Sequence, residues 1–303
     1  MHPNLNQHVQ IETPGARPLD DILRDIYARR GLDRPGGRSR RGWSSRATLQ
    51  KCPYLYQQTY VNGVQGAASA ALETGSIFHA YLANHYLNMM SREHRDECYP
   101  MTPEILRDEL LDGGAHAGPI MDAWQLYEAY AFRYENDYLR PLAVEVAGVV
   151  GEHTCRWDLI AAVDDAQDGV QPGTYIVETK TTSRFDSLNT WTNDGEIVGQ
   201  LWIYEYGGYA EAWGPLRGVI MNICKKKNPD FQRMIIPPQA WQIDGHGRDL
   251  QQWDLLEQLY RTTGMWPRSR ASCVTKYGPC ALFAHCADGT PLDLPPTVDE
   301  DVA

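Results

Sequence analysis

The segment Thr174-Tyr-Ile-Val-Glu-Thr-Lys180 decides most of what the sequence says about the fold. Its β-branched and apolar residues predict a strand, with Glu178 and Lys180 at the end of it. Side chains two residues apart in a strand point to the same face, so Glu178 and Lys180 are expected to project together. Asp158 lies in the preceding apolar stretch, HTCRWDLIAAV at residues 153–163. If the two strands pair as a hairpin, Asp158 comes close to Glu178.

Two carboxylates that lie close together indicate a metal site, because they repel each other unless a cation lies between them. Mg²⁺ or Mn²⁺, which prefer oxygen ligands, fits between Asp158 and Glu178. Such an ion would supply an activated water and charge neutralisation for cleaving a phosphodiester bond. Lys180, beside that water, would assist its deprotonation or stabilise the developing charge. A Glu-x-Lys pattern alone is common, however, and equally describes an ion pair at a strand end.

The order of the predicted elements indicates an α/β protein in which a helical region precedes a central mixed β-sheet flanked by helices. Helices are predicted near residues 19–26, 47–60, 67–90, from 103, and over 120–139, 196–206 and 239–263. Ser44 or Ser45 is expected to cap the helix over 47–60. Strands are predicted over 142–150, 153–163, 174–180, 218–224 and 231–237.

We divide the chain of 303 residues into five parts. Residues 1–43 are expected to be a partly disordered extension, and 291–303 a disordered tail. Residues 44–140 form the helical region, 141–265 the core that contains the predicted sheet, and 266–290 a cysteine-rich segment. No apolar stretch is long enough to span a membrane, and the N-terminus does not have the pattern of a signal peptide. A cytoplasmic protein is therefore expected.

The net charge of −11 argues mildly against a protein that coats nucleic acid, since such binding depends on cations at phosphates. It does not exclude a nuclease, because a local basic groove can coexist with an acidic exterior. The chain also has no phosphate-binding loop of the GxxxxGK[ST] type, so ATP hydrolysis by that route is not expected.

Two further motifs lie on predicted helices. Gly75-Ser-Ile-Phe-His79 is a GxxxH, and Gln200-Leu-Trp-Ile-Tyr204 is a QxxxY. Residues four apart share one face of a helix, so Gln200 and Tyr204 are expected to reach the same site. The order GxxxH, D, ExK and QxxxY resembles the RecB-like nucleases of the PD-(D/E)xK type. These include the CRISPR-associated RecB-like exonucleases, the AddB nuclease domain and standalone phage nucleases.

The resemblance covers roughly residues 44–290 by motif order, and it implies a restriction-endonuclease-like core and a set of site residues. His79, Asp158 and Glu178 match the metal ligands, and the Thr179 carbonyl is a further candidate. Lys180 matches the catalytic lysine.

Three other positions complete the comparison. Gln200 and Tyr204 match the motif that positions the substrate strand and active site. Glu145 fits the upstream acidic residue of these nucleases, with Glu152 as a competing candidate. The sequence departs from the pattern at Cys155, where these nucleases often have glycine three residues before the aspartate; a side chain there could alter access to the metal.

Four of the seven cysteines form a pattern of their own: Cys52 near the start of the core, and Cys273, Cys280 and Cys286 near the end. One early and three late cysteines resemble the 4Fe-4S site of the CRISPR-associated and AddB-type nucleases, which is held by four thiolates. The spacing between Cys273 and Cys280 is longer than is common in those nucleases. A zinc site with the same ligands and unrelated free thiols remain alternatives. Cys98, Cys155 and Cys224 are interpreted as ordinary thiols.

The chain is rich in aromatic residues that can stack on unpaired bases, with nine Trp and seventeen Tyr. Trp191, Trp202 and Tyr206 lie near the predicted site in sequence, and Arg184 is a candidate phosphate contact.

The resemblance implies a Mg²⁺- or Mn²⁺-dependent deoxyribonuclease, with exonuclease action on DNA ends or single strands. The biological setting would be recombination, repair or phage DNA metabolism, with a recombination or replication protein as a candidate partner. A non-catalytic DNA-end-binding scaffold with a degenerate site is the alternative from another class. A restriction-type endonuclease on the same core is a third reading, against which the GxxxH and QxxxY motifs argue.

Overall fold

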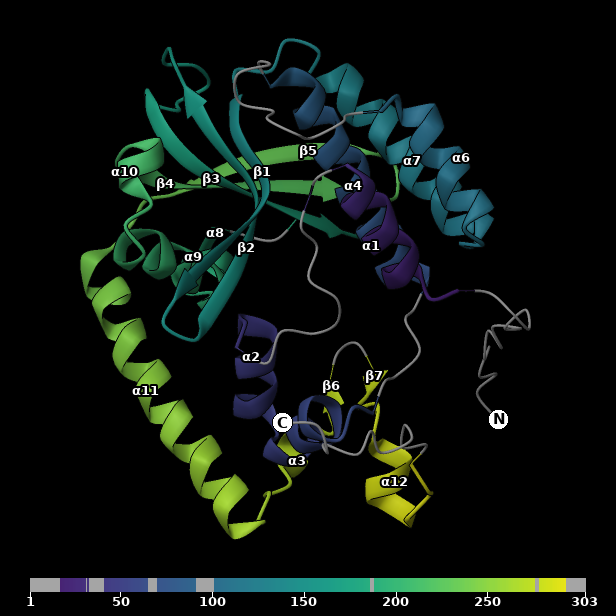
Figure 1. Ribbon diagram of the computed structural model, residues 1–303, viewed down its shortest axis with the longest axis vertical. Coiled ribbons are helices and arrows are strands. Elements are labelled where there is room, and N and C mark those ends of the chain that lie inside the picture. The colour runs from purple at the N-terminus through teal and green to yellow at the C-terminus, as the bar shows by residue number, and fades with distance from the viewer. Residues whose placement is uncertain are drawn as a thin grey trace.

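A computed structural model describes residues 17–30, 32, 41–64, 70–90, 101–185, 188–275 and 278–292 (Figure 1). The expected disorder of the extreme N-terminus and of the tail from 293 lies outside the described residues, as does Cys98.

A five-stranded sheet forms the centre of the fold, in the order β1-β2-β3-β4-β5. The strands are β1 (Arg140–Val150), β2 (His153–Val163), β3 (Gly173–Thr182), β4 (Leu216–Lys225) and β5 (Asp230–Ile236). β3 and β4 are parallel, whereas the other neighbours are antiparallel. A parallel pair needs a crossover connection, and helix α9 (Gly195–Tyr206) lies within it. The predicted mixed sheet flanked by helices is confirmed.

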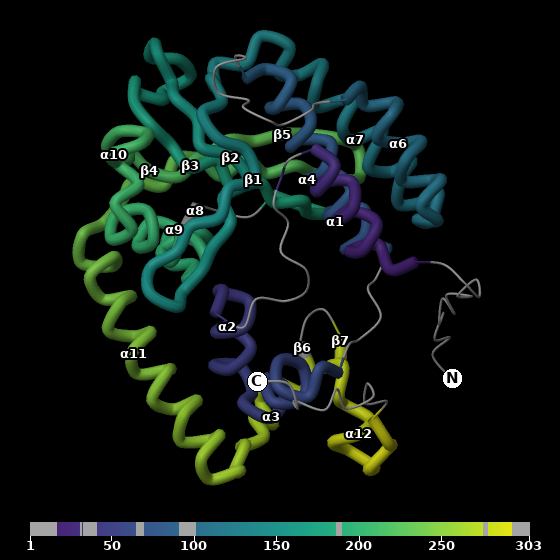
Figure 2. The backbone as a smooth tube through the Cα atoms, viewed as in Figure 1, coloured from purple at the N-terminus to yellow at the C-terminus, as the bar shows by residue number. Residues whose placement is uncertain are grey.

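Helices cover both faces of this sheet, giving three layers (Figures 1 and 2). On one face lie α4 (Ala70–Met89) and α7 (Ala117–Arg133), with α1 (Leu19–Arg29) and α6 (Pro103–Asp112) packed outside them. On the other face α9 packs against the strands, and the long α11 (Ala240–Thr263) packs against α9.

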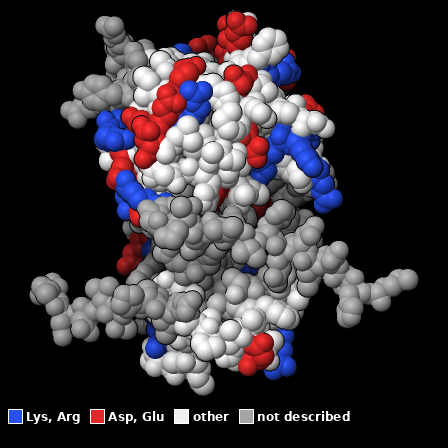
Figure 3. Space-filling model, turned by 90° about the vertical axis from the view of Figure 1, so that its right-hand side faces the viewer, with Lys and Arg blue, Asp and Glu red and all other residues white. Residues whose placement is uncertain are grey.

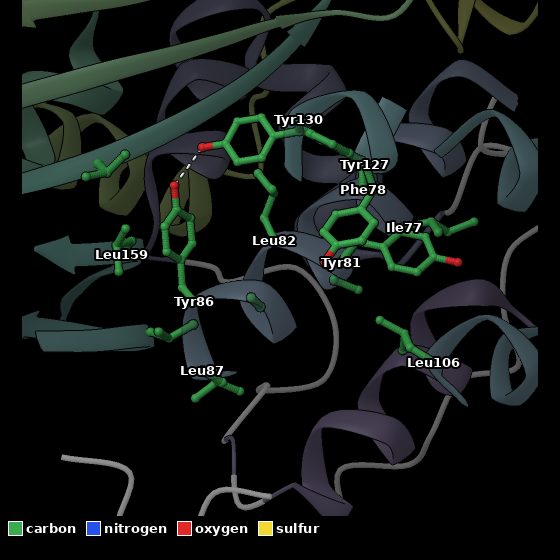
Figure 4. Packing of buried hydrophobic residues seen from close by; sticks show 14 of the residues in the cluster. Ile77, Phe78, Tyr81, Leu82, Tyr86, Leu87, Leu106, Tyr127, Tyr130 and Leu159 are labelled. Carbon is green, nitrogen blue, oxygen red and sulfur yellow. Dashed lines mark hydrogen bonds between the residues drawn. The ribbon is translucent and has the colours of Figure 1, made fainter. Parts of the chain in front are cut away.

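The core on the α4 side is rich in tyrosine and phenylalanine (Figure 4). The hydroxyl groups of Tyr86 and Tyr130 lie 2.6 Å apart and hydrogen-bond to each other. Phe78 packs edge-on against Tyr130, and Tyr81 stacks on Tyr127. Burying aromatic rings of this size contributes much of the stability of the layer.

The helix predicted over 47–60 is broken in the structure. Helix α2 (Trp43–Lys51) ends at Cys52, whose φ of −162° is extended, and α3 (Pro53–Tyr56) begins with proline. The break has a local cause, because a residue before proline is driven out of the helical region. A π-helical turn, η1 (Gln57–Val61), follows. The predicted serine cap is wrong, since the N-cap is Gly42 and Ser45 donates its hydroxyl to the Gly42 carbonyl.

The helix predicted to reach residue 139 ends at Arg133, and the sequence prediction missed several short elements. These are α8 (Leu188–Thr192), α10 (Ala210–Trp213), η2 (Arg270–Ser272), β6 (Val274–Thr275), β7 (Gly278–Pro279) and α12 (Phe283–Asp288).

Acidic and basic side chains are interspersed over the face that carries α1, α6 and α7 (Figure 3). Arg29 pairs there with Glu109 at 2.7 Å, for example. Among the described residues of this face, the basic side chains therefore form no continuous surface for a phosphate backbone. In the described part of the chain, none of the helices has the length and apolar character needed to cross a membrane.

Candidate active site

The regular alternation of side chains is interrupted in β1 and in β2, at two facing residues that carry carboxylates. Glu145 and Asp158 occupy facing positions, between the cross-strand pairs Val144–Leu159 and Val146–Trp157. Glu145 has a φ of 51°, which is costly for a residue other than glycine. In a regular strand, residues two apart face the same side. Here the residues before and after each carboxylate pack into opposite cores: Val144 and Leu159 on the α4 side, Val146 and Trp157 on the α9 side.

Helix α4 adds an imidazole to this pair. The Nδ1 atom of His79 lies 3.3 Å from Oδ2 of Asp158. One ligand atom from each of His79, Glu145 and Asp158 lies within 4.8 Å of the other two. Carboxylate oxygens with one imidazole suit Mg²⁺ or Mn²⁺, so these residues fit the ion that the sequence predicted.

Gly75 explains why the helix can come so close to the sheet. A Cβ atom at Gly75 would lie 3.1 Å from Oγ1 of Thr181, on strand β3. The glycine of the GxxxH motif therefore allows a close approach, one turn before the histidine.

The charges of this group are interdependent. Burial opposes protonation of His79, but Asp158, with smaller contributions from Glu145 and Glu178, raises the pKa of His79 to about 9. Burial likewise favours the neutral form of Asp158, yet His79 and the hydrogen bond from the Thr179 amide lower the pKa of this carboxyl. Asp158 therefore stays ionised beside the protonated imidazole of His79.

Glu178 and Lys180 lie next to this group and contact each other. The Nζ atom of Lys180 lies 2.7 Å from Oε1 of Glu178 and 2.7 Å from Oε2 of Glu196, on α9. Burial raises the pKa of Glu178 to about 7, against the opposing effect of Lys180, and repulsion from Asp158 adds to the rise. Although burial opposes it, the two glutamates raise the pKa of Lys180, which keeps this side chain charged at neutral pH.

The two residues of the QxxxY motif have different surroundings in the structure. Gln200 donates its Nε2 to Oε2 of Glu178 at 2.7 Å and so belongs to the group. Tyr204 is buried among Trp157, Tyr209 and Trp213, and its hydroxyl donates to the Gly214 carbonyl at 2.8 Å. The expectation that both side chains reach one site is therefore met by Gln200 and not by Tyr204.

Glu196 was missed at the sequence level. It lies four residues before Gln200 on α9, so both share one helix face, and both contact the Glu178–Lys180 pair. Its spacing from Gln200 was the available signal. Of the two competing upstream glutamates, Glu145 lies in the group, whereas Glu152 is exposed at the β1–β2 turn and pairs with Arg41 at 2.8 Å.

A chain of buried hydrogen bonds links Thr179 to the aromatic core on the α4 side. Asn222, on β4, donates its Nδ2 to the Thr179 hydroxyl at 3.2 Å and to the Tyr130 hydroxyl at 3.0 Å. Arg233 donates to the same Tyr130 oxygen and pairs with Asp137 at 2.6 Å. The strand that carries Thr179 is thus fixed to the aromatic core.

The remaining predicted residues differ in burial. Cys155 packs against the core on the α9 side, and burial raises the pKa of its thiol. Arg184 is exposed just after β3, and its amide donates to the Thr182 hydroxyl. Trp191 and Trp202 are half-buried, whereas Tyr206 is exposed and donates to Asp244 at 2.7 Å.

The four predicted cluster cysteines gather at the opposite end of the molecule, where α3 meets the C-terminal segment (Figure 1). The Ser269 amide donates to Sγ of Cys52 at 3.4 Å, and Sγ of Cys273 donates to the Ser269 carbonyl at 3.7 Å. The Cys280 amide donates to the Cys273 carbonyl at 2.8 Å. Burial raises the pKa of the Cys286 thiol, and the other three cysteines add to the rise. Residues 51–54 are joined to this segment directly. The Tyr54 amide donates to the Pro267 carbonyl at 3.1 Å, and the Tyr54 hydroxyl lies 2.8 Å from His285.

Most of the sequence matches the model of a known protein family. The model of the PD-(D/E)XK nuclease superfamily matches residues 43–286, which is most of the chain. The chain belongs to the PD-(D/E)XK nuclease superfamily. Its class of activity is therefore that of a nuclease.

One solved structure supports the fold of this PD-(D/E)XK protein. The crystal structure of a candidate exonuclease from Eubacterium rectale superposes with a TM-score of 0.51 at 12% identity, covering 85% of this chain and 91% of that chain. A protein designated SSO0001 superposes with a TM-score of 0.25 at 11% identity, covering 69% of this chain and 85% of that one. No curated protein matches the sequence.

Proposed function

We propose that the protein is a Mg²⁺- or Mn²⁺-dependent DNA nuclease of the RecB-like type, acting as an exonuclease on DNA ends or single strands. The observation that carries the proposal is the group in which His79, Glu145 and Asp158 converge beside the Glu178–Lys180 pair. The motif order shared with RecB-like nucleases supports exonuclease action in recombination, repair or phage DNA metabolism.

His79, Glu145 and Asp158 would hold the metal, with Glu178 and the Thr179 carbonyl as further ligands. When bound, the ion would supply Lewis-acid chemistry at the phosphate and its attacking water. Gln200 fixes the orientation of the Glu178 carboxylate through its hydrogen bond. Tyr204 serves the site indirectly, by anchoring α9 through the Gly214 carbonyl.

Lys180 provides a fixed positive charge next to the phosphate. Its raised pKa keeps it protonated at neutral pH, so it is suited to stabilise developing negative charge rather than to accept a proton. Glu196, which lies on helix α9, contacts the ammonium group of Lys180, which lies on strand β3. This contact limits the positions that the Lys180 side chain can adopt.

Product analysis on DNA of defined topology tests the proposed activity. The purified protein is incubated with Mn²⁺ and with linear single-stranded, linear duplex and circular single-stranded DNA. The proposal predicts degradation of linear DNA to short products while circles stay intact. Cutting of circles would identify an endonuclease, and DNA bound but uncut with every divalent metal would identify a non-catalytic scaffold.

We further propose that Cys52, Cys273, Cys280 and Cys286 hold a 4Fe-4S cluster with a structural role. Four thiols gathered between segments more than 200 residues apart fit such a cluster, and closing so long a loop restricts the unfolded chain. Anaerobic purification, an absorption spectrum and iron, sulfide and zinc analysis test this. Absorption near 400 nm with about four irons is expected; a colourless protein with one zinc would identify a zinc site instead.

A Cys52→Ser variant should lose the bound metal, whereas Cys224→Ser, at a buried cysteine on β4 outside this group, should retain it.

A further inference from the structure

A cavity of about 530 Å³ lies beside the candidate active site and plays no part in the roles described above. Its walls come from the start of α2, the β1–β2 hairpin, α9 and α11. Cavities of this size are typical of sites for small organic groups. Glu196 and Gln200 belong both to the cavity wall and to the group around Glu178, so the cavity adjoins the Glu178–Lys180 pair.

Aromatic rings form one side of the cavity. The ring of His246 lies 6.1 Å from Trp43 and 6.0 Å from Trp202, between centroids. Gly195 and Gly247 make room for these tryptophans, because a Cβ atom at either position would collide with an indole ring. Flat apolar rings are suited to stack on a nucleobase, and this stacking depends little on which base is present.

The charges at the cavity favour a base over a phosphate. The guanidinium groups of Arg41 and Arg46 line the wall, but both are paired with Asp254 and Glu257 of α11. Burial lowers the pKa of His246 to about 4 and also lowers that of His153, so both imidazoles are neutral. An anion would gain little from such a surface.

The wall also contains buried polar atoms that lack a hydrogen-bond partner. Among the described residues of the wall these include Nδ1 of His153, Nε of Arg156 and Oε1 of Gln200. Leaving a buried polar atom unpaired is unfavourable, so a ligand that offers both donors and acceptors would relieve it. The edge of a nucleobase offers both.

We propose that this cavity receives one unpaired nucleobase of the DNA strand, adjacent to the phosphate that is cleaved. The inference rests on the proposed function, and it adds a substrate preference. A base can enter only when it is out of the double helix, so the enzyme acts on single-stranded or frayed DNA.

A scan with abasic nucleotides tests this directly. A five-nucleotide single strand is bound to the full-length protein in Ca²⁺, to limit turnover, with one abasic position moved along the oligonucleotide. Wild type should lose roughly tenfold in affinity when the base that enters the cavity is missing, and little at the other positions. Trp202→Leu should bind all five oligonucleotides alike. Trp241→Leu, at a tryptophan that is 70% exposed and outside the cavity wall, should keep the wild-type profile.

The outcomes separate this inference from the function on which it rests. If DNA is bound and cleaved but the abasic scan is flat, the cavity does not hold a base, while the nuclease assignment stands. If Trp202→Leu keeps the wild-type profile, the base lies elsewhere. If the protein neither binds nor cleaves DNA with Mn²⁺, the proposed function fails, and this inference fails with it.

Discussion

Glu145 and Asp158 face each other across β1 and β2 at the point where both strands lose their regular alternation. An irregularity of this kind re-aims side chains, and such features concentrate next to active sites. The strained backbone at Glu145 therefore has a structural purpose, since it brings this carboxylate within ligand distance of Asp158 and His79.

Removing the charge of Glu145 should weaken metal binding. We expect Glu145→Gln to lower Mn²⁺ affinity by about tenfold or more, because even residues that only orient a ligand cost about 10–100-fold when lost. The matched control is Glu152→Gln, whose side chain is 74% exposed at the hairpin turn and should bind Mn²⁺ like wild type. Calorimetric titration of both variants provides the comparison, and equal losses in the two would contradict the placement of Glu145.

Adding one methyl group at Gly75 should disturb the site through helix α4. The new Cβ would lie 3.1 Å from the Thr181 hydroxyl, so either this hydroxyl or α4 with His79 must give way by a few tenths of an ångström. Misplacing a catalytic group by about 1 Å costs up to about 100-fold in rate. We expect Gly75→Ala to cleave DNA about tenfold more slowly, and Thr181→Ala in the same chain to restore the rate. Gly118→Ala, at a helix position with open space far from the site, should leave activity unchanged. Failure of Thr181→Ala to rescue would argue against the close approach as the cause.

The two residues of the QxxxY motif should respond differently to substitution. Gln200→Ala frees the Glu178 carboxylate and should reduce cleavage strongly. Tyr204→Phe removes only the hydrogen bond to the Gly214 carbonyl, so it should cost about 1 kcal/mol of stability and leave the cleavage rate within about threefold of wild type. Rates measured at saturating Mn²⁺, with thermal unfolding of the same samples, separate the two effects. A Tyr204→Phe variant that is folded but inactive would place the hydroxyl in the chemistry after all.

His246 should make the stability of the protein depend on pH. Burial lowers its pKa from about 6.5 in the unfolded chain to about 4 in the folded protein. Between these values the unfolded state binds the proton more readily, so stability falls as the pH drops from about 6.5 toward 4, by at most about 1.4 kcal/mol per pH unit. Urea unfolding at several pH values should show a shallower dependence for His246→Gln than for wild type. Identical slopes in the two proteins would show that His246 is not held neutral.

The sheet and the ExK strand could be predicted because their signals are local. The apolar run before Glu178 and the i, i+2 spacing to Lys180 depend only on strand geometry, which the structure reproduces in β3. The choice between Glu145 and Glu152 depends on the β1–β2 register and on a positive φ, neither of which a hydrophobic pattern records.

Other parts of the site depend on packing that only the folded chain provides. Helical periodicity puts Gln200 and Tyr204 on one face, but it does not say that Tyr204 lies deep enough to meet Gly214. Glu196 takes part only because the Lys180 side chain extends from the sheet to α9, and this contact cannot be read from the sequence. The break at Cys52 had a local signal, because Pro53 disfavours a helical residue before it. The helical pattern continues on both sides of this break, and for that reason one helix was predicted.

The most direct test of the central claim is the rate of Mn²⁺-dependent degradation of linear DNA by Lys180→Met and Lys225→Met. Both lysine side chains are 26% exposed at the ends of adjacent parallel strands, but Lys225 pairs with Asp230 outside the site. We predict that Lys180→Met loses at least about 100-fold in rate with an unchanged fold, while Lys225→Met stays within about threefold of wild type. A folded Lys180→Met variant that degrades DNA at the wild-type rate would contradict the assignment of this group as the active site.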